Sequence, residues 1–141
     1  MSQVYWDSMV FIYLLESHPQ LSPKVERILR QIESRGDTLM TSVFTIGEVL
    51  TGPRRAGVTK IADAIGAYFE SGRVALLPFD KETADRYSII RASLKVSQAD
   101  GIHLATAAIA GADAFVTNDQ RLWTMQVPGI KFMVDLDGKV F

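Results

Sequence analysis

The sequence predicts an α/β fold in which helices cover both faces of a central parallel sheet of about five strands. Short apolar segments of strand length alternate with longer segments of helical periodicity, which is typical of parallel sheets joined by crossover helices. With 141 residues, of which 48% are hydrophobic and 22% charged, the chain can bury one compact core. It contains no repeat or linker-like segment, so we expect a single domain over residues 1–141.

Five short apolar segments have the length and composition of strands. They are residues 4–6, 38–41, 74–77, 114–117 and 130–134. The segments between them show helical spacing or helix-capping residues, so consecutive strands are expected to run parallel.

Capping residues mark the first two expected helices. Asp7 or Ser8 can cap a helix over residues 9–17. Because Ser8 can serve as the cap, the Asp7 carboxylate is left free for another role. Ser22 is the expected cap of the second helix, which ends at Gly36.

Glycine and proline limit the helices in the middle of the chain. A helix over residues 42–50 is expected to close at Gly52 and Pro53. The basic segment 52–59 is then a loop or a helix break. The next helix covers residues 61–71.

Two longer helices and a short turn complete the chain. Asp80 is the expected N-cap of a helix over residues 81–95, and a further helix over residues 98–110 ends at Gly111. A short helical turn is expected at residues 119–123.

Composition argues against several classes of protein. The formal net charge is −1, which disfavours a general basic coat for nucleic acid but allows a local basic rim. The chain has no cysteine and two histidines, so disulfides and zinc centres built on thiolate or imidazole are not expected. No apolar run approaches the roughly 20 residues of a membrane span, and the N-terminal segment lacks a basic start. We therefore expect a soluble, cytoplasmic protein with no membrane contact.

Four acidic residues lie in apolar surroundings. Two of them follow an expected strand, one lies near the start of an expected helix and one lies inside a helix. They are Asp7, Glu48, Asp100 and Asp119. Asp7 follows the first strand and Asp119 the fourth, so both fall at the carboxyl edge of the sheet, where parallel α/β folds bind ligands. Glu48 and Asp100 lie on helices, and this topology can bring all four together.

Converging carboxylates need a compensating charge. At about 4 Å, two of them repel by about 4 kcal/mol at an effective dielectric near 20, so four require a cation or bound protons. Oxygen ligands suit Mg²⁺, for which Mn²⁺ can substitute, and such an ion assists phosphodiester hydrolysis. Each acid also has an ordinary alternative as a helix cap or as a favourable charge at a helix start, with Glu48 in a capping box with Thr45.

The two histidines can also have ordinary structural roles rather than a role in the acidic site. His18 precedes a proline at a helix end and is expected to be a solvated surface residue. His103 lies three residues after Asp100, on the same helical face. It can donate to that carboxylate or occupy a hydrogen-bonded core position.

These segments resemble the PIN domain, a family of small metal-dependent ribonucleases, and most closely its VapC-type toxin branch. The resemblance rests on WDSMVFIYLLE around Asp7, TSVFTIGEVLTG around Glu48 and ADGIHLATAAIAGADAFVTNDQRL around Asp100 and Asp119. It spans nearly the whole chain and implies a PIN-like three-layer fold in which the four acids are catalytic and bind the metal. Polar neighbours of the acids match the family too, and they are Ser8, Thr117 and Asn118.

The resemblance also implies a function. It indicates a Mg²⁺-dependent endoribonuclease that hydrolyses RNA with a metal-activated water, as the toxin of a type II toxin–antitoxin pair. A homodimer and an inhibitory antitoxin protein are implied, with transfer RNA or ribosomal RNA as the substrate. The alternatives are a housekeeping RNA-processing nuclease and a non-catalytic module that binds RNA or protein, the latter disfavoured by the intact set of acids. An Asp-x-Asp phosphatase is not expected, because Met9 stands where its second carboxylate would be.

Three basic residues near the acids are candidates for contacts with RNA phosphates. Arg91 and Lys95 lie four residues apart on the helix that leads to Asp100, and Arg121 closely follows Asp119. We expect these three to form a basic rim, whereas most other Lys and Arg side chains are expected to be solvated.

Overall fold

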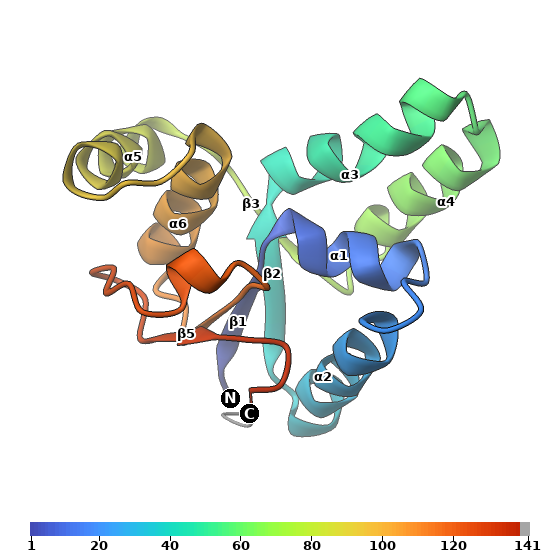
Figure 1. Cartoon of the computed structure of the whole chain (residues 1–141), viewed down its shortest axis with the longest axis horizontal. Helices are drawn as coiled ribbons and strands as arrows, with labels where there is room; N and C mark the ends of the chain where they lie inside the picture. The colour runs from blue at the N-terminus through green and yellow to red at the C-terminus, as the bar shows by residue number, and fades with distance from the viewer. Residues whose placement is uncertain (139–141) are drawn as a thin grey trace.

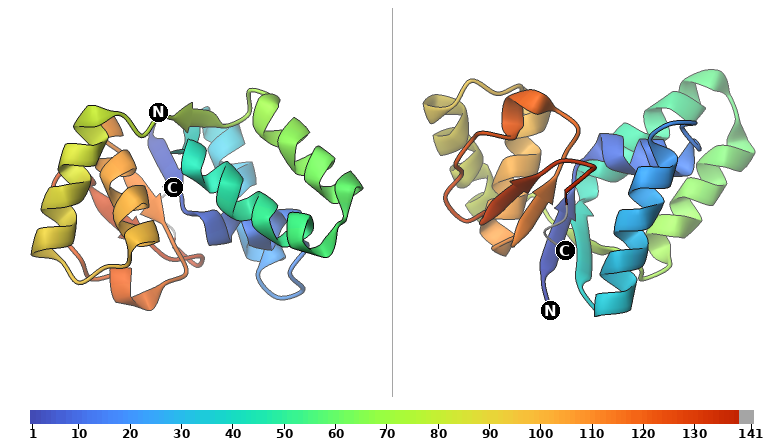
Figure 2. Two further views of the ribbon diagram at one scale, coloured as in Figure 1. Left: turned by 90° about the horizontal axis from the view of Figure 1, so that it is seen from above. Right: turned by 60° about the horizontal axis from the view of Figure 1, so that its bottom comes forward.

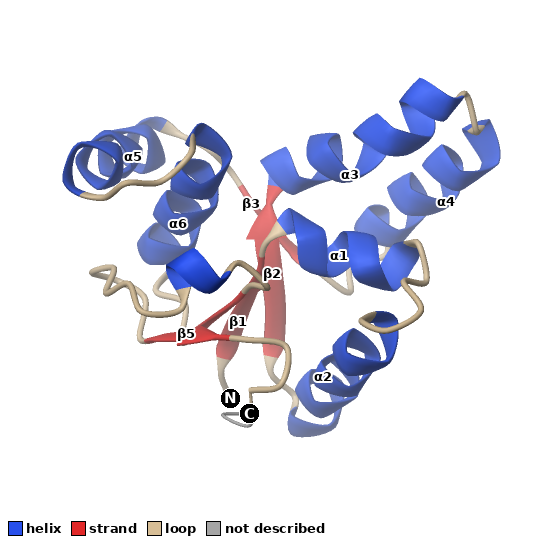
Figure 3. Ribbon diagram, in the orientation of Figure 1, coloured by secondary structure: helices blue, strands red, loops and turns tan. Residues whose placement is uncertain are grey.

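A five-stranded parallel sheet forms the centre of the computed structural model, which describes residues 1–138. Residues 139–141, the last of the expected domain, lie outside the described residues. The strand order is β3-β2-β1-β4-β5 (Figures 1 and 3). The strands are β1 (Gln3–Trp6), β2 (Thr38–Ser42), β3 (Ala75–Leu77), β4 (Ala114–Val116) and β5 (Phe132–Val134). All five overlap the expected strands, and the predicted fold class is confirmed.

Helices cover both faces of this sheet. They are α1 (Ser8–Leu15), α2 (Ser22–Arg35), α3 (Val43–Ala56), α4 (Thr59–Glu70), α5 (Lys81–Ser93) and α6 (Gln98–Ala110), with a 3-10 helix η1 (Gln120–Leu122). Helices α5 and α6 lie on one side of the sheet and α1 to α4 on the other (Figure 2). Among residues 1–138, no helix combines the length and the apolar character that crossing a bilayer requires.

Alternation along β1 explains why two separate cores form. Val4 and Trp6 pack with Phe11 in the core under α1 to α4. Tyr5, between them, points to the opposite face and stacks on Phe115 with 5.2 Å between ring centroids. Because consecutive strand residues point to opposite faces, one short apolar strand supplies both cores, as expected of a parallel sheet that is covered on both sides.

Helix α3 runs past its expected end. It continues to Ala56 with Pro53 buried inside it, and it ends where Gly57 adopts a left-handed conformation with φ of 68°. A proline removes one main-chain hydrogen bond, but α3 stays packed along α4, and this packing keeps the segment helical. The expected helix break within residues 52–59 is therefore present, but it lies at Gly57 and Val58 rather than at Gly52 and Pro53.

Candidate active site

Asp7 directly follows β1 and is the N-cap of α1. Its side chain accepts a hydrogen bond from the N–H of Val10 at 3.4 Å, and only 9% of the residue is exposed. Ser8 lies inside the first turn of α1 and does not cap it. The expectation that a Ser8 cap would leave Asp7 free is wrong, although a carboxylate that caps through one oxygen still has lone pairs to offer.

The surroundings of Asp7 disfavour its ionised form. Burial raises the pKa of this carboxyl above its usual value, and the nearby Asp100 carboxylate raises it further. Hydrogen bonds from Thr117 and from the N–H of Val10 act in the opposite direction without cancelling the rise. A cation at this place would favour the ionised form.

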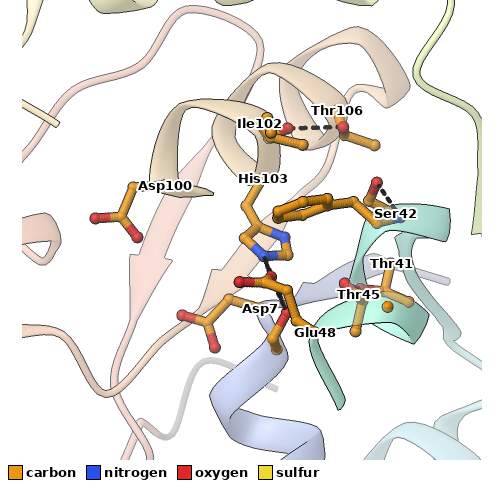
Figure 4. A network of polar contacts seen from close by, with 12 residues as sticks. Asp7, Thr41, Ser42, Thr45, Glu48, Asp100, Ile102, His103 and Thr106 are labelled. Atoms are coloured by element: carbon orange, nitrogen blue, oxygen red, sulfur yellow. Dashed lines mark hydrogen bonds and ion pairs between the residues drawn. The ribbon is translucent and has the colours of Figure 1, made fainter. Parts of the chain in front are cut away.

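Glu48 reaches the same region from α3 and is held by two donors. Ser8 Oγ donates a short hydrogen bond to Glu48 Oε1, and His103 Nε2 lies 2.7 Å from the same oxygen (Figure 4). Burial opposes the ionisation of Glu48, but the hydrogen bonds from His103 and Ser8 outweigh burial and lower its pKa. Glu48 is therefore an ionised carboxylate whose position is fixed.

Neither Glu48 nor Asp100 caps its helix. Ser42 caps α3, and the buried hydroxyl of Thr45 bonds to a neighbouring threonine, so the capping box is absent. Ser97 caps α6 by accepting the N–H of Asp100 at 3.1 Å. Both carboxylates are thus left for other partners.

Three of the four acids share one cleft. Figure 4 shows Asp7, Glu48 and Asp100 directed toward a common space from the end of β1, from α3 and from α6. These residues, with Ser8 and His103, line a cleft of about 160 Å³. Among residues 1–138, the Asp100 side chain has no hydrogen-bond or ion-pair partner that competes with a ligand.

Asp119 is not among the residues that line this cleft, and it pairs with Arg121. Arg121 Nε and Nη2 lie 3.0 and 2.7 Å from the two carboxylate oxygens. This bidentate pair holds the pKa of Asp119 below its usual range and raises that of Arg121. Arg121 also interacts with the charge of Asp100, so the pair borders the other acids.

The polar residues after β4 contribute unequally. Thr117 is fully buried, accepts the N–H of Asp119 at 3.1 Å and hydrogen-bonds Asp7. It therefore connects two of the acids. Asn118 instead donates to the hydroxyl of Tyr13 at 3.3 Å.

The expected basic residues differ in their positions. Arg91 Nη1 donates to the hydroxyl of Tyr87 at 2.8 Å, and a Cβ on Gly101 would lie 2.9 Å from Arg91 Cδ. Arg91 therefore packs against α6 next to Asp100. Lys95 is exposed but lies beyond the end of α5 at Ser93, so the expected helical spacing between these two residues is wrong.

His103 is a buried, hydrogen-bonded residue, one of the two positions expected for it. It is 3% exposed and bonds to Glu48 rather than Asp100. Its Nδ1 lies 2.7 Å from the hydroxyl of Tyr5. The contact of Tyr5 with His103 was not predicted, because it joins residues 98 positions apart. The one local signal was a hydroxyl group within an apolar strand.

The donor set fits a Mg²⁺ ion by its chemistry. Mg²⁺ prefers hard oxygen ligands and combines a few carboxylates with water. Asp7, Glu48 and Asp100 supply such oxygens around one cleft. The carboxylates are not preassembled, because among residues 1–138 no three acidic or histidine side chains already form a metal-binding group.

Comparison with known proteins identifies the family. The model of the PIN domain matches residues 4–126. The chain belongs to the PIN domain family. A search of curated proteins found no significant match to this chain.

Solved structures with the same fold include VapC-type toxins. VapBC2 from Rickettsia felis, bound to promoter DNA, is 15% identical with a TM-score of 0.75, covering 94% of this chain and 98% of that one. VapBC-1 from nontypeable Haemophilus influenzae is 21% identical with a TM-score of 0.67, covering 96% and 98%. VapC20 from Mycobacterium tuberculosis, a toxin that cleaves the sarcin–ricin loop, is 16% identical with a TM-score of 0.65, covering 79% and 86%. The expected PIN fold is confirmed, and these VapC-type toxins share it.

Proposed function

We propose that this PIN domain is a Mg²⁺-dependent endoribonuclease and the toxin of a type II toxin–antitoxin system. The observation that carries the proposal is the cleft shared by Asp7, Glu48 and Asp100. The likeness in fold to a toxin that cleaves the sarcin–ricin loop supports RNA as the substrate. The likeness to VapBC proteins supports a cognate antitoxin as the partner.

Four carboxylates would hold the ion: those of Asp7, Glu48 and Asp100, which line the cleft, and that of Asp119, which follows β4. A bound Mg²⁺ ion lowers the pKa of a coordinated water and stabilises negative charge on phosphate oxygens. The protein side of the reaction is to keep the ligands charged and oriented. Ser8 and His103 do this for Glu48 by donating to Oε1.

The basic side chains around the cleft would position the RNA. Arg91 and Arg121 flank Asp100 from α5 and η1, where their charges suit phosphates on either side of the scissile bond. Lys95 is exposed near the start of α6. Cleavage is expected to leave a 5′-phosphate and a 3′-hydroxyl, and transfer RNA is the first substrate to test, followed by ribosomal RNA.

Cleavage of RNA by the purified protein, with and without Mg²⁺, tests the chemistry. Asp7→Asn and Asp100→Asn should abolish cleavage, because each removes a charged ligand. Asparagine is a good N-cap, so Asp7→Asn keeps the start of α1 intact. Asp63→Asn is the matched control, since Asp63 is an exposed acid on α4. Equal cleavage by Asp7→Asn and the parent would refute the assignment.

Expression in cells tests the biological role. A toxin should arrest growth when expressed alone, and both Asp7→Asn and co-expression of a small antitoxin encoded next to it should relieve the arrest. Harmless expression of an active enzyme would favour a housekeeping nuclease. Sedimentation of the purified protein should give the mass of two chains, since we propose a homodimer.

A further inference from the structure

A chain of buried hydrogen bonds joins the main chain of β2 to the carboxylate of Glu48. The N–H of Ser42 donates to the hydroxyl of Tyr5 at 3.2 Å. This hydroxyl lies 2.7 Å from His103 Nδ1, and Nε2 of the same ring lies 2.7 Å from Glu48 Oε1. Tyr5 and His103 are both buried, at 0% and 3% exposure, so water does not compete for the hydrogen bond between them.

The direction of each hydrogen bond follows from the protons that are available. The Tyr5 oxygen accepts from Ser42, so its own proton needs an acceptor, and His103 Nδ1 makes the shortest contact with it. Thr41 and Thr45 also interact with the phenol. However, a neutral imidazole nitrogen is a stronger acceptor than a hydroxyl oxygen, and Nδ1 of His103 lies only 2.7 Å from the phenol oxygen. The hydroxyl of Tyr5 therefore donates to Nδ1.

This direction assigns the tautomer of His103. With Nδ1 as acceptor, the ring proton sits on Nε2 and points at Glu48 Oε1. The opposite tautomer would set a nitrogen lone pair against a carboxylate oxygen at 2.7 Å and would leave the buried proton of Tyr5 without its acceptor, which is costly. A tyrosine phenol carries its proton at neutral pH, so it is available for this hydrogen bond.

We propose that Tyr5 and His103 are positioning residues that orient Glu48 for ligand binding. Tyr5 fixes the tautomer of His103, and His103 and Ser8 together hold Oε1 of Glu48, so that Oε2 is presented to the cleft. In many metal sites a hydrogen bond from an outer residue fixes the orientation of a histidine ligand. Here the ligand that is fixed in this way is the Glu48 carboxylate. The final step, from Oε2 to Mg²⁺, rests on the proposed function, whereas the fixed tautomer does not.

The tautomer can be measured on metal-free protein by NMR of the histidine ring nitrogens. The chain has two histidines, and His18 is an internal reference because its Nδ1 accepts the N–H groups of Gln20 and Leu21 at 3.2 and 3.1 Å. We expect His103 to carry its proton on Nε2. In Tyr5→Phe, the Nδ1 signal of His103 should lose the shift of a hydrogen-bonded nitrogen while His18 stays unchanged. A proton on Nδ1 in the parent, or an unchanged Nδ1 signal in Tyr5→Phe, would overturn the proposal.

Metal affinity without RNA provides the second readout. Mg²⁺ and Mn²⁺ titrations followed by the melting temperature should show about tenfold weaker binding for Tyr5→Phe, at the low end of outer-shell effects. Tyr68→Phe is the matched control, because the Tyr68 hydroxyl is buried without a hydrogen-bond partner among residues 1–138. It should bind metal like the parent. The phenylalanine at position 5 keeps the stack on Phe115, so the fold should survive.

A double-mutant cycle tests whether Tyr5 acts through His103. His103→Leu should weaken metal binding, and adding Tyr5→Phe should weaken it little further, since the two changes interrupt one path. Additive losses would show that Tyr5 acts independently and would overturn the proposal. If the parent shows no metal-dependent shift at all, the proposed function fails, while the NMR measurement still decides the tautomer.

Discussion

Asp7 has two roles that conflict when no cation is present. As the N-cap of α1 it must accept an N–H at a buried position. As a buried carboxylate near Asp100 it has a raised pKa, so its ionisation costs stability. Glu48 differs because Ser8 and His103 donate to it and lower its pKa. The pKa values of Asp7 and Glu48 are thus shifted in opposite directions, because Glu48 has two strong side-chain donors.

We predict that the metal-free protein loses stability as the pH rises through the raised pKa of Asp7. The native state holds this proton more tightly than the unfolded chain does. The stabilisation from this tighter proton binding is therefore complete below 3.8, the pKa of Asp7 in the unfolded chain. It is lost as the pH rises through the higher pKa of Asp7 in the folded protein. Urea unfolding in EDTA, over about pH 4 to 8, measures the effect.

The matched variant for this pH dependence is Asp7→Asn. The lowered pKa values of Glu48 and Asp119 favour folding at higher pH, but they act in parent and variant alike. The difference between the two stability curves therefore isolates Asp7. If the difference in unfolding free energy between the parent and Asp7→Asn did not change with pH, burial of Asp7 would not disfavour its ionised form.

The helices and strands that the sequence predicts well are those with local signals. Asp80, Gly36 and Gly111 cap or end helices where expected, because capping chemistry acts within one turn. The end of α3 was missed because packing against α4 outweighs the local effect of Pro53. Local signals therefore predict these helix ends, whereas packing carries α3 past its proline.

At the scale of a helix, we predict that the cap of α6 affects stability and the site together. This helix carries Asp100 and His103, and Ser97 Oγ accepts the N–H of Asp100 at 3.1 Å. Ser97→Ala should cost about 1 kcal/mol and lower the melting temperature by about 2 to 5 °C. Ser97→Asn keeps a capping oxygen and should stay close to the parent. Equal losses in both variants would show that the cap is not the cause.

At the scale of the whole molecule, the site lies where the order of the sheet reverses. From β1 the chain proceeds outward to β2 and β3, and then returns to β4 and β5 on the other side. Asp7 and Asp119 follow the two adjacent strands β1 and β4, so their common edge was predictable from the sequence. The contact of Glu48 with His103 was not, because it joins α3 and α6, which cover opposite faces of the sheet.

We predict that Mg²⁺ reverses the stability ranking of the parent protein and Asp7→Asn. Without metal at neutral pH, the parent keeps the cost of a buried charge near Asp100, so Asp7→Asn should be at least as stable. With Mg²⁺ at 100 times its dissociation constant, the parent should gain about 2.7 kcal/mol by mass action, and the variant should gain much less. Asp63→Asn should follow the parent under both conditions. Thermal unfolding in EDTA and in Mg²⁺ at equal ionic strength measures both rankings, and a parent that stays less stable than Asp7→Asn in saturating Mg²⁺ would refute the metal site.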